Sequence, residues 1–305
     1  MAKKGVIRSF LIYQQQVLKR PFTTVRTYAG ALKLFNRIVS INTDPRRATP
    51  AHVGQLVKEM ADAEMAATTI RARVAAISSF FEWALGQNLA DRNPTKGVAL
   101  PKPPQLLPRS LDYRTIVAPK IEAVDGDDFF SLRDRTILEM GFATAARVSD
   151  LVNMNWRDLD LKSSRVKIHG KGDREDLVNF GAMAGVALSR YLTVRHDRFG
   201  LENEALFLND NGDRLSTVGR IVKARTGYSP HVIFRHSGAV AFLERGASIE
   251  DVRAHLRHES IQTTSRYVRV TNDRLKASYL SHYPRALEED HITTDKEVGQ
   301  SARSD

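Results

Sequence analysis

The sequence predicts a mainly helical protein of two domains, with a small β-hairpin or sheet in the second domain only. Three observations support this fold class. The chain has 305 residues, 42% of them hydrophobic, which is enough to fill two cores. Apolar residues recur at helical spacing through residues 1–92. Five prolines between residues 93 and 108 then interrupt the helical pattern.

The helices of the first domain are predicted from their apolar stripes and their start signals. Serine, threonine and asparagine favour the position before a helix, and proline favours the first helical position. Four helices are expected: over residues 9–19, after a cap at Thr23 or Thr24, from Thr49-Pro50, and from about Thr69.

Charge is distributed unevenly along the chain. Residues 1–108 hold 16 basic and 6 acidic side chains, whereas residues 109–305 hold 30 and 29, so ten of the eleven excess positive charges lie in the first third. Such an excess predicts a polyanionic partner, most commonly nucleic acid. Five basic residues lie off the apolar stripes of the predicted helices and together make a candidate DNA-binding set: Arg26, Lys33, Arg37, Arg71 and Arg73.

The proline-rich segment, residues 93–110, is predicted to be a semi-rigid linker to a second domain over residues 111–285. The last twenty residues, 286–305, hold 6 acidic and 2 basic side chains and are expected to be a flexible tail. Within the second domain we expect a helix over 129–141, a hairpin with strands 165–169 and 176–180, a strand over 205–208, and helices from 217 onward.

Composition excludes several classes of protein. The chain has no cysteine, so disulfides, thiolate metal sites and cysteine nucleophiles are all excluded. No window approaches 18 consecutive apolar residues, and the first residues do not form a signal peptide. We therefore expect a soluble cytoplasmic protein without membrane contact. No carboxylate group has metal-ligand spacing, so neither a metal nor another cofactor is expected.

Four short patterns of the second domain could carry chemistry. They are Ala-Ala-Arg-Val-Ser-Asp-Leu around Arg147, Gly-Lys-Gly around Lys171, the histidine-rich segment that ends in Arg235-His236, and Leu-Arg-His at His258 followed by Tyr267. Guanidinium groups bind phosphate oxygens and stabilise the charge of a phosphoryl-transfer transition state. A tyrosine phenol can attack phosphorus as a covalent nucleophile. A set rich in cations and poor in acids suits a phosphoryl transfer without metal.

The four patterns resemble those of the tyrosine recombinases, also called the phage integrase family, and the layout is most similar to the short Xer-type members. Arg147 matches the first arginine box, Lys171 the catalytic lysine and Arg235 the second arginine box. His258 follows Arg235 by 23 residues and Tyr267 follows His258 by nine, as in the family. The resemblance implies a SAM-like helical core-binding domain followed by an α+β tyrosine-recombinase catalytic domain.

The sequence departs from the family pattern at two positions. The family has histidine three residues before its second arginine, where this chain has Val232, with His231 one place earlier. Either an extra residue bulges here and His231 still reaches the phosphate, or that role is vacant; we favour the bulge. The family also has glycine before its last histidine, where this chain has Arg257. His236 is expected to be structural, and Asp150 to support the arginine region.

The resemblance implies a site-specific recombinase or integrase that cuts and rejoins double-stranded DNA through a 3′-phosphotyrosyl intermediate, without ATP or metal. Tyr267 would be the nucleophile and Lys171 the general acid, while Arg147 and Arg235 bind the phosphate. His258 and His231 would hydrogen-bond the phosphate or accept the tyrosine proton. Four protomers would assemble on two DNA sites, and a partner recombinase or accessory protein is possible. The alternatives are a type IB topoisomerase-like enzyme and a catalytically weakened, DNA-binding accessory member.

Overall fold

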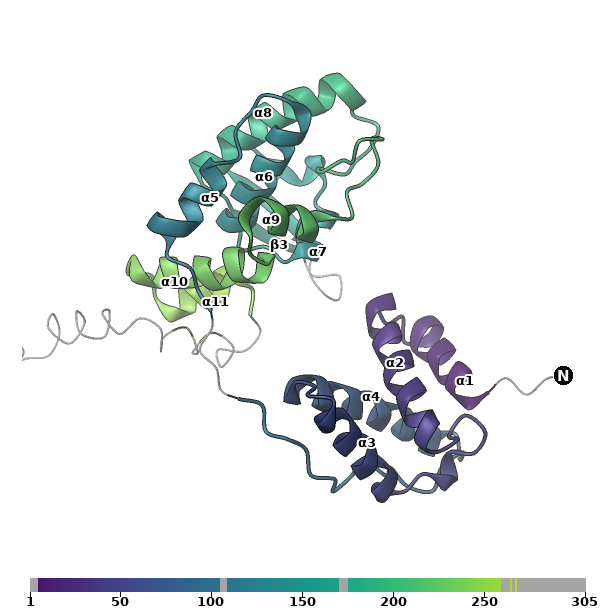
Figure 1. Ribbon diagram of the computed structural model, residues 1–305. Helices are drawn as coiled ribbons and strands as arrows, with labels where there is room; N and C mark the ends of the chain where they lie inside the picture. Colours follow the sequence, from purple (N-terminus) through teal and green to yellow (C-terminus); the bar gives the residue numbers. More distant parts are fainter. Residues whose placement is uncertain (1–4, 105–108, 170–174, 259–263, 265–266, 268–305) are drawn as a thin grey trace, which may run out of the picture. The chain divides into compact units, whose positions relative to one another are not determined.

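The computed structural model describes residues 5–104, 109–169, 175–258, 264 and 267. The chain forms two compact units, Met1–Leu106 and Leu107–Asp305, and the division falls inside the proline-rich segment. The first unit is helical, and the second combines helices with a small sheet (Figure 1). Among the described residues, no helix combines the length and the apolarity that crossing a membrane requires.

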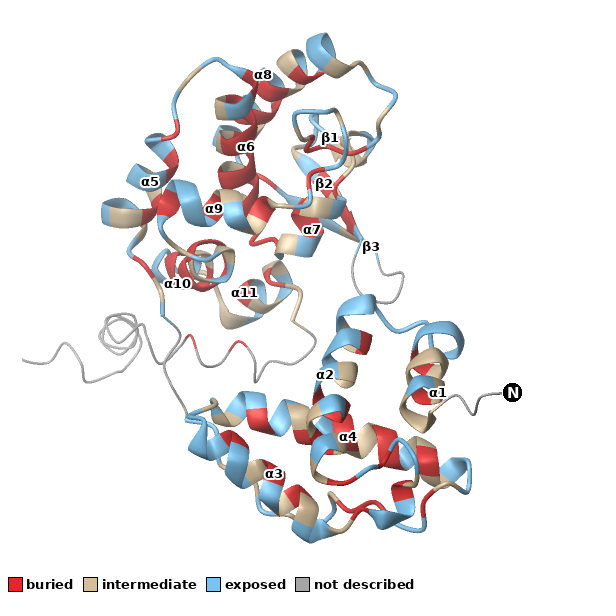
Figure 2. Cartoon of the chain, turned by 45° about the vertical axis from the view of Figure 1, so that its right-hand side comes forward, coloured by how far each residue is buried: buried red, intermediate tan, exposed pale blue. Residues whose placement is uncertain are grey.

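The first unit is a set of helices with one shared apolar core. Helices α2 and α4 turn one side toward the core and expose the other, as the burial colours of Figure 2 show. Aromatic rings dominate the centre, where Phe80 lies edge-on to both Phe10 and Phe81. The elements are α1 (Val6–Ile12), the π-helical η1 (Tyr13–Val17), α2 (Phe22–Ile38), the 3-10 helix η2 (Pro45–Arg47), α3 (Pro50–Asp62) and α4 (Ala67–Gly86).

Of the two helix caps predicted at residues 23–24 and 49, the second is confirmed and the first is wrong. Thr49 caps α3, with its Oγ1 accepting the His52 N–H at 3.4 Å and Pro50 in the first helical position. Helix α2 instead starts earlier, at Phe22, and neither predicted threonine caps it. Pro21 holds the extended conformation before this helix, and its carbonyl accepts the Val25 N–H at 3.2 Å. Backbone geometry at proline replaces the side-chain cap.

The start of the proline-rich segment packs onto the first unit. The Asn93 amide is buried; its Nδ2 donates to Glu82 Oε1 at 2.8 Å and to Ser78 Oγ at 3.0 Å. Its Oδ1 accepts from Thr95 Oγ1 at 2.7 Å. A buried amide with partners on both atoms fixes the direction of the chain as it leaves α4.

The second unit is built around helix α6, which is buried along most of its length and packs against α8 (Figure 2). Its helices cover a core that includes Leu132, Ile137, Leu188 and Phe234. The elements before the sheet are η3 (Tyr113–Val117), α5 (Ala118–Glu122), α6 (Phe129–Ala143), α7 (Val148–Asn153) and η4 (Trp156–Asp158). Those after it are α8 (Ala182–Phe199), α9 (Val218–Thr226), η5 (His231–His236), α10 (Ser237–Glu244) and α11 (Ile249–His255).

The predicted hairpin is present in an antiparallel sheet of order β1-β2-β3. Strands β1 (Leu159–Asp160), β2 (Arg165–His169) and β3 (Glu175–Asn179) pair with Val166 opposite Val178, and both side chains face the core. The predicted turn between β2 and β3 lies outside the described residues.

The prediction of a strand over 205–208 is wrong. The segment makes only isolated bridges, Asn155 with Ala205 and Leu208 with Arg214. Side chains satisfy the rest of its backbone: Arg195 donates to the Ala205 carbonyl at 2.8 Å, and the Tyr191 hydroxyl donates to the Leu206 carbonyl at 3.1 Å. Burial raises the pKa of Tyr191 to about 12, so the hydroxyl keeps its proton for this bond. The continuous apolar run Ala205-Leu206-Phe207-Leu208 is buried, but it does not form a ladder.

Candidate active site

Two helices of the second unit end close together in the same uncommon way. Helix α6 ends with Ala145 at φ 46°, and the next N–H, that of Ala146, bonds back to the Gly141 carbonyl at 3.2 Å. Helix α11 ends with Arg257 at φ 52°, and the His258 N–H bonds back to the Arg253 carbonyl at 3.1 Å. This left-handed helix ending favours glycine. Here an alanine and an arginine occupy it.

The guanidinium group of Arg235 joins these two helix ends. Its Nη1 donates to the Ala145 carbonyl at 2.7 Å, and its Nη2 donates to the Leu256 carbonyl at 2.9 Å. Nη2 also lies 2.9 Å from His258 Nε2. Because arginine has five N–H groups, these contacts leave two for a ligand. The predicted second-box arginine is therefore both a structural bridge and a phosphate-binding candidate.

The positive charges around Arg235 favour the binding of an anion beside it. Burial, together with the neighbouring charges of Arg147 and Arg257, lowers the pKa of Arg235 to about 10, so the group stays protonated at neutral pH. The carboxyl ends of helices carry partial negative charge, which stabilises a cation placed there. The two helix ends thereby offset part of the cost of burying Arg235.

The segment that carries Arg235 is a π-helix, η5, rather than an α-helix. A π-helical turn contains one residue more than an α-helical turn. Val232 consequently packs against the core, while His231, one residue earlier, lines a pocket together with Arg235. The π-helical turn is compatible with the predicted extra residue, and the role of His231 at the phosphate stays a prediction. Gly141 allows the close approach of the same segment, since a Cβ there would lie 2.4 Å from Phe234 Cε2.

The pocket beside Arg235 has a volume of about 410 Å³ and collects four of the six predicted catalytic residues. Since a guanidinium can only donate, His258 Nε2 accepts from Arg235, which places the proton on His258 Nδ1, 2.9 Å from Thr264 Oγ1. His258 is therefore assigned as neutral and oriented from both sides. The lining consists of Ala146, Arg147, Val148, Pro230, His231, Arg235 and His258.

Tyr267 does not line this pocket. Its ring is fully buried, at 0% exposure, in a small cluster with Leu243, Val252 and Leu256. Its hydroxyl lies 2.8 Å from His236 Nδ1, and the His236 ring in turn lies edge-on to that of His231, with centroids 4.2 Å apart. His236 is buried and hydrogen-bonded as predicted, but its partner is the predicted nucleophile.

Lys171 lies outside the described residues, so its predicted role stays a prediction. Asp150 supports the arginine region as expected, through contacts that the sequence did not indicate. Its Oδ2 accepts the backbone N–H of Arg147 at 3.0 Å and the Arg257 guanidinium at 2.5 Å. Within the described residues, no group of three or more histidine and acidic side chains could hold a metal ion.

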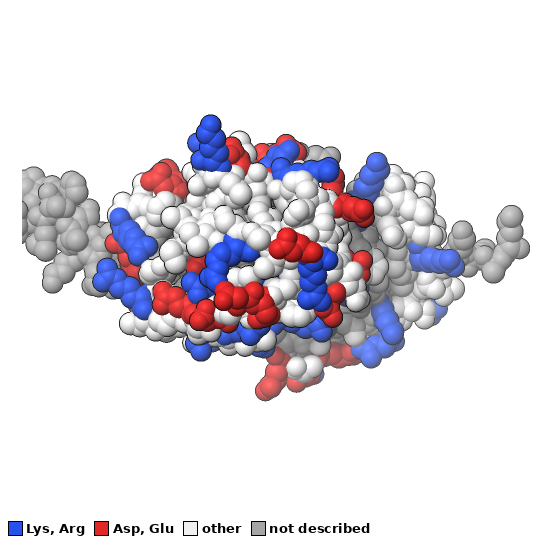
Figure 3. Space-filling view, turned by 90° about the horizontal axis from the view of Figure 1, so that it is seen from above, with Lys and Arg blue, Asp and Glu red and all other residues white. Residues whose placement is uncertain are grey.

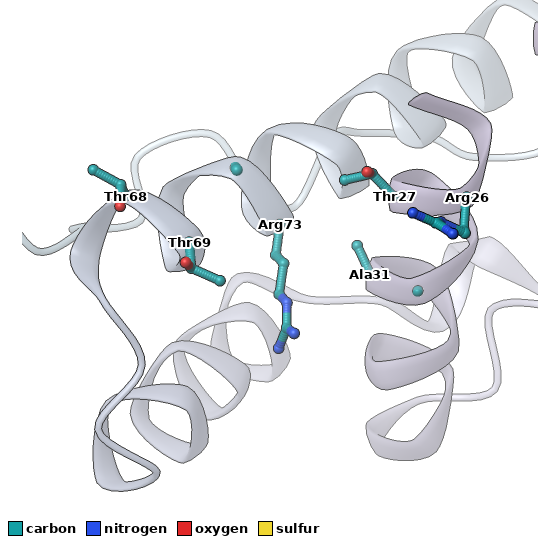
Figure 4. Close-up of a pocket in the computed structure, with 8 residues that line it drawn as sticks. Arg26, Thr27, Ala31, Thr68, Thr69 and Arg73 are labelled. Carbon is teal, nitrogen blue, oxygen red and sulfur yellow. The ribbon is translucent and has the colours of Figure 1, made fainter. Parts of the chain in front are cut away.

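The predicted DNA-binding residues of the first unit divide into two groups. Arg26 and Arg73 line one hollow of about 450 Å³ between α2 and α4, together with Thr27, Thr68 and Thr69 (Figure 4). The exposed residues Lys33, Arg37 and Arg71 lie outside this hollow. In the described part of the chain, none of the five predicted residues forms an ion pair with a carboxylate.

Many charges of the second unit are paired with each other. Arg190 pairs with Asp127, and Arg157 pairs with Glu204 at 2.9 Å. Figure 3 shows one face of the molecule on which basic and acidic side chains are interspersed. Basic and acidic side chains, nearly equal in number after residue 108, are thus mixed over this surface. The pocket that Arg147 and Arg235 line is a local excess of positive charge.

Comparison with known proteins assigns the family. Residues 117–274 match the Phage integrase family, and residues 7–88 match the Phage integrase, N-terminal SAM-like domain. The chain belongs to the phage integrase family. The two matches also confirm the predicted pairing of a SAM-like helical domain with a catalytic domain.

Curated relatives of this integrase-family chain are Xer recombinases. It is 35% identical to tyrosine recombinase XerC of Staphylococcus carnosus over 231 residues, 73% of this chain and 77% of the relative. It is 31% identical to tyrosine recombinase XerD of Halalkalibacterium halodurans over 297 residues, 92% of this chain and 98% of the relative. The protein is a tyrosine-type site-specific DNA recombinase.

Solved structures share the fold of this recombinase. XerH bound to palindromic difH substrate, in a post-cleavage complex, matches with a TM-score of 0.70 and 17% identity, covering 90% of this chain and 83% of XerH. A lambda integrase dimer bound to a COC′ core site matches with a TM-score of 0.65 and 18% identity, covering 85% of this chain and 94% of the integrase chain.

Proposed function

We propose that the pocket beside Arg235 binds the phosphate at which this recombinase cuts double-stranded DNA. The observation that carries the proposal is the convergence of Arg147, His231, Arg235 and His258 on one cationic hollow. Two arginines can bind the non-bridging phosphate oxygens and stabilise the extra negative charge of the five-coordinate transition state. Neutral His258 accepts an N–H of Arg235 and so helps to orient this guanidinium in the pocket.

We propose Tyr267 as the nucleophile and Lys171 as the general acid. The Tyr267 oxygen would form a bond to phosphorus while the bond from phosphorus to the 5′ oxygen breaks, giving a 3′-phosphotyrosyl link. The 5′ oxygen would take its proton from Lys171, and a second DNA end would then reverse the step. Because each step exchanges one phosphodiester for another, neither ATP nor a metal is needed.

The burial of Tyr267 adds a conformational step to this proposal. Its hydroxyl is hydrogen-bonded to His236 and is not in the pocket, so attack requires the phenol to move toward Arg235. His231 lies edge-on to His236 and also lines the pocket. Of these two imidazoles, His236 is the one placed to accept the phenol proton. DNA binding would supply the free energy for the movement.

The first unit is proposed to bind the DNA backbone. Its hollow presents Arg26 and Arg73 with threonine hydroxyls, a combination that suits phosphate oxygens rather than base edges. We retain the proposed boundaries: a core-binding domain over 1–92, a linker over 93–110, a catalytic domain over 111–285 and a tail over 286–305. Four protomers on two DNA sites remain the proposed assembly, with a partner recombinase or accessory protein as a possible addition.

The central test is covalent trapping on a nicked duplex. The cleavable site is first selected from random-sequence DNA as the sequence that yields a protein adduct. A nick beside the cleaved bond lets the short product diffuse away, so the adduct accumulates. We expect wild-type protein and Tyr228→Phe to form it and Tyr267→Phe to lose it entirely, as seen by denaturing gel electrophoresis. An adduct with Tyr267→Phe, or none with wild type, overturns the proposed chemistry.

The offset histidine is tested with neighbouring alanine variants. His231→Ala is expected to slow adduct formation by about tenfold or more, because it removes a hydrogen-bonding group from the pocket. Val232→Ala is expected to change the rate by less than about threefold, because Val232 packs on the core. Single-turnover rates on the trapped substrate measure both. Equal losses for the two variants contradict the role of His231.

The DNA-binding role of the first unit is tested by salt dependence. Arg26→Ala and Arg73→Ala are each expected to reduce the slope of log affinity against log salt by about 1, because each removes one phosphate contact. Arg46→Ala is the matched control, since its guanidinium is already bound to Asp91 and the Asn88 carbonyl. Fluorescence anisotropy at several salt concentrations measures the slopes. An unchanged slope for Arg26→Ala and Arg73→Ala would place the DNA elsewhere.

A further inference from the structure

Arg257 has a left-handed backbone conformation that glycine adopts more readily, and its side chain is buried beside two carboxylates. Its φ is 52°, and its side chain is only 9% exposed. Nη2 donates to Asp150 Oδ2 at 2.5 Å, and Nε lies 3.9 Å from Asp176 Oδ2 on β3. An arginine that is both strained and buried at a helix end indicates a function for its charge.

The partner of Arg257 identifies that function. Asp150 is needed at its position because its Oδ2 accepts the backbone N–H of Arg147 and so fixes the turn that carries this arginine. The same carboxylate is buried, three residues from Arg147, and would attract the Arg147 guanidinium. Within the described residues, Asp150 pairs with Arg257 and not with the Arg147 side chain.

We propose that Arg257 is a positioning residue of the strand-transfer reaction: by neutralising Asp150, it leaves the Arg147 guanidinium available to the DNA phosphate. This inference rests on the proposed function of the pocket. Asp150 can then cap the arginine turn without competing with the phosphate for Arg147. Arg257 itself is not among the residues that line the pocket, which separates its role from direct binding.

The charges around Asp150 support this assignment. Arg147, Arg235 and Arg257 carry three positive charges, and the carboxylates of Asp150 and Asp176 both lie beside Arg257. Without Arg257, the buried Asp150 carboxylate would be left without this partner, three residues from Arg147, where it would oppose the binding of a phosphate.

Charge rescue tests the proposal on the nicked duplex. Arg257→Met is expected to lower the single-turnover rate of adduct formation at saturating DNA by about tenfold or more. The reason is that the variant leaves the Asp150 carboxylate without the positive charge that neutralises it. Adding Asp150→Asn should raise that rate by about tenfold, because an asparagine still accepts the Arg147 N–H without attracting its guanidinium. Arg257→Lys, which keeps the charge, should retain at least about a third of the wild-type rate.

The possible outcomes distinguish a failure of this inference from a failure of the proposed function on which it rests. Suppose that wild-type protein forms the adduct but Arg257→Met combined with Asp150→Asn is no faster than Arg257→Met. Arg257 then does not act through Asp150, so this inference is wrong while the proposed function stands. If Arg257→Lys is as slow as Arg257→Met, charge is not the property that matters, which also overturns it. No adduct with wild type removes the proposed function itself. Arg245→Met, an exposed arginine outside the pocket, controls for general charge loss, and melting temperatures confirm folding.

Discussion

The site depends on one buried cation, Arg235, placed at the ends of two helices. The Ala145 and Leu256 carbonyls would lack partners at the ends of α6 and α11, and the guanidinium satisfies both. This bridge brings the Arg147 turn and His258 into the lining of one pocket. Folding and phosphate binding thus use the same group, whose planar shape allows several directed hydrogen bonds that a lysine could not make.

The π-helix and the two left-handed helix endings are consequences of the same arrangement. An extra residue in η5 turns His231 toward the pocket and lets Val232 pack inward. Residues that are not glycine at both helix ends store a small strain, which the contacts of their neighbours offset. At the site, these departures from regular geometry set the direction of chemical groups.

The sequence predicted the parts of the fold that follow from periodicity and spacing. The α3 cap at Thr49 and the hairpin strands needed only local information, whereas the extra residue near Val232 was predicted from the family's spacing. The contacts of Arg257 with Asp150, 107 residues away, and of His236 with Tyr267 were not predictable, because no local pattern specifies partners so distant in the chain. The strand expected over 205–208 failed for a related reason: Arg195 and Tyr191 satisfy its backbone from another helix.

The measurement that tests this account most directly is backbone hydrogen exchange in the wild type and in Arg235→Lys. If Arg235 joins the two helix ends, amides of residues 145–151 and 252–258 should together exchange about tenfold faster or more in the variant, while those of α8 stay protected. Unchanged exchange in both segments, or equal acceleration in α8, would show that the site is held together by something other than this guanidinium.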